Sequence, residues 1–64
     1  MNSIRELRIR KNLTQQQLAN MVGISKKTIS AYETGKAVPS LKVAIKLAKV
    51  LDVSLDNLFD STKV

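Results

Sequence analysis

The sequence predicts an all-α fold, a compact domain of five short helices. Residues that start and stop helices recur along the 64 residues, and the apolar residues between them lie three and four positions apart, which is the spacing of one helix face. No segment alternates apolar and polar residues for long enough to indicate a strand. Hydrophobic residues make up 44% of the chain, which is enough for the core of one small globular domain.

The first helix is predicted from a capping box near the start of the chain. Ser3 and Glu6 have the S-x-x-E spacing of that motif. Ile4 and Leu7 begin the apolar stripe of this helix. Asn12 is expected to stop it, because Asn tolerates a positive φ.

The second helix is expected to follow Thr14, which forms a T-x-x-Q capping box with Gln17. Gly23 is expected to end it, since Gly takes up a left-handed conformation at little cost. Its inward side is predicted to contain four residues: Leu18, Met21 and Val22, with Ala19 beside them.

The third helix is predicted at residues 25–33, with Ser25 as its cap and Gly35 as its stop. Ile29 and Tyr32 form its apolar side. The remaining face is polar and cationic. The apolar side of this helix is therefore expected to pack against the rest of the domain, and the polar side is expected to be exposed.

Two further helices complete the prediction. Pro39 places a loop at residues 36–39, because the residue before a proline disfavours the helical conformation. Ser40 then caps a fourth helix and Ser54 opens a short fifth one. The apolar positions of the fourth helix are predicted to be Leu41, Ala44, Ile45, Ala48 and Leu51, and those of the fifth Leu55, Leu58 and Phe59.

Charge and composition narrow the class of function. The net charge is +6, of which residues 1–36 supply +5 (seven Lys or Arg against two Glu), and a basic half of this kind suits a polyanion. The chain contains no cysteine and no histidine, so thiolate metal sites and the commonest general base are excluded. A cytoplasmic protein is expected, because neither a signal peptide nor an apolar run of about 20 residues is present.

Arg8 and Glu33 stand where apolar residues would be expected, each beside an inward stripe. Burying either charge alone would be costly. We therefore expect the two to form a structural ion pair that ties the first helix to the third. The alternative is that both side chains extend to solvent.

Several stretches together resemble one known family. The matching pieces are LTQQQLA at 13–19, VGIS at 22–25, TIS at 28–30, YETGKAVPS at 32–40 and LAKVLDVSLDNLF at 47–59. The chain resembles the lambda-repressor-like helix-turn-helix proteins, of the Cro or xenobiotic-response-element type, over about residues 3–59. One departure is Asp52, where the family usually has Gly.

The resemblance implies a single DNA-binding domain over residues 1–64, with its core at about 3–59. Helices two and three would form the helix-turn-helix, and the protein would be a transcriptional regulator, by default a repressor. The partner implied is double-stranded DNA. No cofactor, metal, membrane or small-molecule ligand is expected.

The resemblance also places the third helix in the major groove. At 100° per residue, Lys26, Lys27, Ser30 and Thr34 share one face of this helix and Ala31 borders it. Lys26, Lys27, Ser30 and Ala31 are then the base-contacting positions. The alternative for the two lysines is contact with phosphates only, because Lys is less directional than Arg.

Gln15 lies in the first turn of the second helix, where the family contacts a phosphate. The alternative for this Gln is a solvated side chain without a contact. The other residues expected at phosphates are Gln16, Ser25, Thr34 and Lys36.

A homodimer is expected, because the family commonly binds two-fold symmetric sites. The candidate interface residues are Leu55, Phe59, the tail up to Val64 and residues 1–3. The alternative is that Leu55 and Phe59 only close the core.

Two other classes of function compare with DNA binding as follows. An enzyme is not expected, because no carboxylate has a neighbour suited to acid–base chemistry. A module that binds a partner protein, as antitoxins and phage regulators of this size do, remains the alternative reading.

Overall fold

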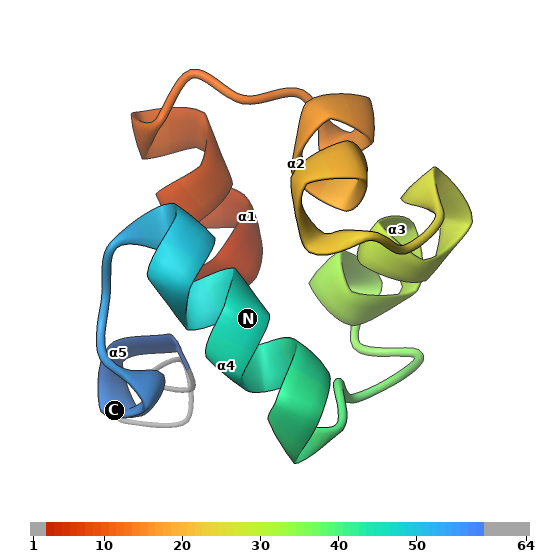
Figure 1. Cartoon of the computed structure of the whole chain (residues 1–64). Coiled ribbons are helices and arrows are strands. Elements are labelled where there is room, and N and C mark those ends of the chain that lie inside the picture. Colours follow the sequence, from red (N-terminus) through yellow and green to blue (C-terminus); the bar gives the residue numbers. More distant parts are fainter. Residues whose placement is uncertain (1–2, 59–64) are drawn as a thin grey trace.

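A computed structural model shows that the chain is helical, and it describes residues 3–58. Within these residues there is no strand, and the five-helix prediction is confirmed. The helices are α1 (Ser3–Arg10), α2 (Gln15–Val22), α3 (Lys26–Thr34), α4 (Leu41–Leu51) and α5 (Leu55–Leu58) (Figure 1).

Side-chain caps start the middle helices, as the sequence predicts. The Thr14 hydroxyl accepts the Gln17 backbone N–H at 3.0 Å, and the Gln17 side-chain oxygen accepts the Thr14 N–H at 2.8 Å. This reciprocal pair is the predicted capping box. Ser40 caps α4 in the same way by accepting the Val43 N–H at 3.3 Å. The side chain of Ser3, predicted to cap α1, lies outside the described part of the chain.

The third helix differs from its prediction by one residue at each end. Ser25 is the cap that precedes α3, and its hydroxyl accepts the Thr28 N–H at 3.1 Å. The helix therefore begins at Lys26, and it continues through Thr34 instead of ending at residue 33. The reason is that Gly35, which supplies the left-handed stop, directly follows Thr34.

Each of the helices α1 to α4 is followed by a residue in the left-handed conformation. Gly23 and Gly35 have φ values of 84° and 82°, and each N–H returns to a carbonyl of the preceding helix. Asn12 and Asp52 take the same conformation at 58° and 60°. Asn12, Gly23 and Gly35 are the stops expected from residue type, and Asp52 takes the left-handed conformation at the position where the family usually has Gly.

The helices surround one core (Figure 1). α4 packs against α2 and α5, and α1 packs against α3 and α5. The core residues are apolar, and they are Ile4, Leu18, Ala19, Val22, Ile29, Tyr32, Ala44, Leu47, Ala48, Leu51 and Leu58.

Three residues predicted to face inward are exposed instead. Met21 is 58% exposed, Leu41 68% and Ile45 39%. The buried side of α2 is narrower than the sequence suggests, because Met21 is exposed. In α4 the buried side is turned toward Leu47, which is missing from the predicted stripe and is fully buried. Phe59, predicted to belong to the fifth helix, lies outside the described residues.

Candidate nucleic-acid interface

α2 and α3 form a helix-turn-helix whose turn depends on close backbone contacts. Ala19 is fully buried, and its carbonyl accepts the N–H groups of Gly23 at 2.8 Å and of Ile24 at 3.0 Å. Ile29 is fully buried and Tyr32 is 7% exposed, so the back of α3 is anchored in the core. The opposite face of α3 is therefore free to meet a ligand.

The front of α3 is cationic and open. Lys26 and Lys27 are exposed, while Ser30 and Ala31 are half-buried beside them. Lys36, in the loop after α3, is also exposed. Among residues 3–58, none of these three lysines forms an ion pair, so their charge is available to a polyanion.

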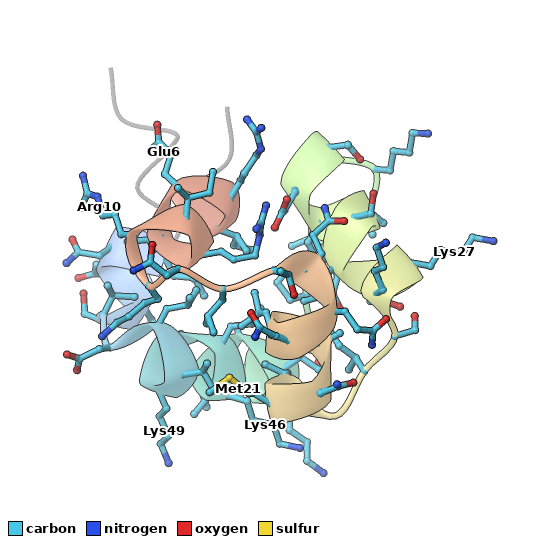
Figure 2. The ribbon with its side chains drawn as sticks, turned by 90° about the horizontal axis from the view of Figure 1, so that it is seen from above. Glu6, Arg10, Met21, Lys27, Lys46 and Lys49 are labelled. Carbon is cyan, nitrogen blue, oxygen red and sulfur yellow. The ribbon has the colours of Figure 1, made fainter. Side chains whose placement is uncertain are left out.

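Figure 2 shows that two lysines of α4, Lys46 and Lys49, point away from Lys27. Lys27 extends outward from α3, whereas Lys46 and Lys49 extend from α4 in another direction. The exposed lysines on the helix-turn-helix and in the loop after it are Lys26, Lys27 and Lys36.

The first turn of α2 carries the two glutamines expected at phosphates. Gln16 is exposed, and its amide donates to the Asn20 side-chain oxygen at 3.0 Å. Gln15 is half-buried, and its amide nitrogen donates to Glu33 Oε1 at 3.0 Å. The sequence does not predict the bond between Gln15 and Glu33, because these residues lie 18 positions apart on different helices and form no local motif.

The hydroxyl groups expected at phosphates already have protein partners. Ser25 Oγ accepts the cap bond from Thr28 and lies 2.8 Å from the Thr28 hydroxyl. Thr34 Oγ1 donates to the Ser30 carbonyl at 3.0 Å. A Thr34 hydroxyl that donates within α3 must exchange that bond before it can donate to a phosphate.

Arg8 and Glu33, expected to pair, lie in direct contact. Arg8 Nε is 2.7 Å from Glu33 Oε2, and Arg8 Nη2 donates to Oε1 at 3.3 Å. The side chains are 12% and 3% exposed. Arg8 Nη1 also donates to the Leu13 carbonyl at 2.7 Å, so one guanidinium joins α1, the loop before α2, and α3.

An open hollow of about 490 Å³ lies where the end of α1 meets the start of α2. Gln15, Gln16 and Lys26 line it, together with Arg8. All four side chains are hydrogen-bond donors. The hollow thus joins the first turn of α2 to the first residue of α3, on the helix-turn-helix itself.

Two further features are absent from the described part of the chain. Residues 3–58 contain no group of three or more side chains suited to holding a metal ion. No helix among them has the length and apolar character needed to cross a membrane.

Fold and site together define a helix-turn-helix domain with a cationic front. The helix-turn-helix family matches residues 4–58, and this chain belongs to it. A protein of Methanocaldococcus jannaschii described as an uncharacterized HTH-type transcriptional regulator is 45% identical over 58 residues, which cover 91% of this chain and 88% of the relative.

Solved structures of the same architecture agree with this assignment. The P22 c2 repressor, bound to a synthetic operator, matches with a TM-score of 0.83 and 34% identity over 86% of this chain and 83% of the repressor chain. The restriction-modification controller protein C.AhdI of Aeromonas hydrophila matches with a TM-score of 0.81 and 38% identity, covering 88% and 85% of the two chains. The fold is therefore lambda-repressor-like.

Proposed function

We propose that this protein is a sequence-specific regulator of transcription that inserts α3 into the major groove of double-stranded DNA. One observation carries the proposal. Ile29 and Tyr32 of α3 are buried in the core, whereas Lys26 and Lys27 of the same helix are exposed. Repression by occupancy of an operator is the proposed mode of action. The P22 relative, a repressor bound to an operator, supports this reading.

Within this proposal, the base edges are met by the front of α3 and the phosphates by its surroundings. The base-contacting residues are Lys26, Lys27, Ser30 and Ala31, and the phosphate-contacting residues are Gln15, Gln16, Ser25, Thr34 and Lys36. Lys donates to guanine O6 and N7, and an Ala methyl packs on a thymine methyl. Phosphate contacts set the register of the helix, and base contacts set the sequence preference.

Two copies are proposed to bind one two-fold symmetric operator. One short helix reads only a few base pairs, which is too little to select a site among about 10⁶ competitors. Half-sites in such operators are about 34 Å apart, while one copy measures 30 × 23 × 21 Å. Copies on adjacent half-sites would therefore be neighbours on the DNA, and we propose that they contact each other.

An exposed apolar patch is available for that contact. Val38, Leu41 and Ile45 are 79%, 68% and 39% exposed. Val38 lies in the same loop as Lys36, so a second copy seated on this patch would stand beside the proposed DNA surface. Of the interface candidates expected from the sequence, Leu55 packs against the core, and residues 1–2 and 59–64 lie outside the described part.

Binding, and not catalysis, is the proposed activity, and the cytoplasm, where the DNA lies, is the proposed location. Glu33, the carboxylate at the site, is already bonded to Arg8 and Gln15, which leaves it unsuited to acid–base work. The proposed domain covers the whole of residues 1–64.

Selection of bound duplexes from a random DNA library tests the proposal. The expected result is one enriched sequence with two-fold symmetry and half-sites about one helical turn apart. Binding of the selected duplex should weaken steeply as salt is raised, since counterions are released from the phosphates. If no sequence is enriched and no duplex binds at low salt, the protein-interaction reading replaces this one.

A further inference from the structure

The Glu33 carboxylate has more hydrogen-bond donors than an ion pair needs. Arg8 supplies Nε at 2.7 Å to Oε2 and Nη2 at 3.3 Å to Oε1. Gln15 supplies its amide nitrogen at 3.0 Å to Oε1. One carboxylate on α3 therefore holds both a side chain of α1 and the first side chain of α2.

The bond to Glu33 determines which way the Gln15 amide faces. An ionised carboxylate only accepts hydrogen bonds, so the NH₂ group of Gln15, and not its carbonyl oxygen, must face Glu33. That NH₂ group has two N–H bonds, and Glu33 Oε1 takes one of them. The second N–H remains for another acceptor. If the amide rotated by half a turn, an oxygen would stand in place of that donor.

The surroundings of Gln15 suit an anion. Gln15, Gln16, Lys26 and Arg8 line the same open hollow. The negative charge of Glu33 would repel a phosphate. However, the Arg8 guanidinium pairs with the Glu33 carboxylate, and the Glu33 side chain is only 3% exposed. The hollow thus presents donors and a lysine charge beside the apolar side chains of Ile9 and Leu13, and the Glu33 carboxylate bonded to Gln15 is paired with Arg8.

We infer that Glu33 is a positioning residue for DNA binding, which orients the Gln15 amide so that its second N–H donates to a backbone phosphate seated in this hollow. This role rests on the proposed function, and it adds to the part that Glu33 plays in joining α1 to α3. Arg8 contributes by holding Glu33 in place and by cancelling its charge.

A double-mutant cycle on DNA binding tests the inference. Its four proteins are the wild type, Gln15→Ala, Glu33→Gln and the double variant, each titrated into a labelled duplex of random sequence at low salt. In the wild-type background, Gln15→Ala is expected to weaken binding roughly three- to tenfold, the value of one hydrogen bond. In the Glu33→Gln background, the same change should cost less than about twofold, because the amide at position 33 no longer imposes one orientation on Gln15.

Gln16→Ala is the matched control. Gln16 lies in the same turn and the same hollow, but its amide bonds to Asn20 and not to Glu33. Its effect on binding is expected to be the same with Glu33 or Gln at position 33. A general loss of fold in the Glu33→Gln variant would alter both glutamine effects alike, so the control separates positioning from stability.

The outcomes are distinct. If Gln15→Ala costs the same in both backgrounds, the positioning role is wrong and the proposed function stands. If the wild type shows no salt-sensitive binding to the duplex at all, the proposed function fails and the positioning role fails with it.

A measurement on the unaltered protein covers the case in which Glu33→Gln does not fold. The side-chain NH₂ protons of Gln15 are followed by ¹⁵N-resolved NMR. One of them is expected to exchange slowly with solvent while the other exchanges as fast as those of exposed Gln17, and addition of the duplex should shift the fast one. Two fast protons in the free protein, or no shift of either proton with duplex, would overturn the inference.

Discussion

Arg8 joins three parts of the chain through one guanidinium. Its guanidinium bonds to Glu33 on α3 and to the Leu13 carbonyl before α2. A pair of this kind need not add net stability over an apolar pair, but the loss of one partner leaves the other charged and buried. Single residues of this type are therefore more sensitive to substitution than their surface neighbours.

Arg8→Ala is accordingly expected to lower the free energy of unfolding by about 3 kcal/mol, because it leaves the nearly buried Glu33 carboxylate unpaired. Arg10→Ala is the control, since Arg10 is exposed at the end of the same helix and points into solvent (Figure 2). Its effect should stay within about 0.5 kcal/mol. Urea unfolding of both variants measures the difference, and equal midpoints would contradict the role given to Arg8.

Lys27 and Lys36 should differ in how they affect DNA binding. Loss of Lys27 is expected to relax preference at particular base pairs by about 1–3 kcal/mol. Loss of Lys36 should weaken binding to all sequences alike and reduce the salt slope by about one unit. Titration of each Ala variant against the selected operator and its single-base variants makes the comparison. A uniform loss for Lys27→Ala would show that this lysine meets phosphates only.

At the scale of elements, helix ends are predictable from this sequence because their signals are local. The Thr14–Gln17 box and the left-handed Gly23 involve residues only a few positions apart. Side-chain burial is less predictable, because it depends on where neighbouring helices lie. Met21 and Leu41 have the right spacing for a core position, yet no helix covers them.

Asp52 allows a test of how much the left-handed residue at the end of a helix affects the stability of the protein. Its φ of 60° at the end of α4 is a conformation that Asp adopts at some cost and Gly freely. Asp52→Gly is therefore expected to stabilise the protein by up to about 1 kcal/mol, since the exposed contact with Lys11, at 3.9 Å, contributes little.

Gly23→Ala serves as the opposite case. A Cβ at Gly23 would meet no atom within 4 Å, so the cost comes only from the φ of 84°. That cost is expected to be about 1–2 kcal/mol. Thermal unfolding of both variants decides the matter, and a lower melting temperature for Asp52→Gly would show that the aspartate side chain contributes more than its backbone strain costs.

At the scale of the whole molecule, the sequence predicts the fold and the face of α3 but not the way the site is held together. The face follows from helical periodicity, which places Lys27 nearly opposite Ile29 on α3. The link from Gln15 to Glu33 spans 18 positions and arises only when α2 and α3 are packed. The Arg8–Glu33 pair spans 25 positions, but two charges beside apolar stripes made it predictable.

Dimer formation is tested on the whole protein. Sedimentation equilibrium at micromolar concentration is expected to show a dimer, and Leu41→Lys should shift it toward monomer by placing a charge in the apolar patch. Ile9→Lys is the control, because Ile9 is also an exposed apolar residue, at 51%, but lies on α1 away from the patch. A dimer unaffected by Leu41→Lys would place the interface elsewhere.

The division of α3 into a buried back and an open front has a consequence for how such a protein changes over generations. Substitutions at Lys27 remove no packing and no ion pair within the described chain, and exposed changes of this kind cost within about 0.5 kcal/mol. New operators are thus accessible by single steps that leave the fold intact. Gln15 has no such freedom, because its bond to Glu33 belongs to the framework as well as to the DNA surface. If the proposed contacts hold, a lineage of these proteins can therefore change its target sequences while keeping one way of seating the DNA backbone.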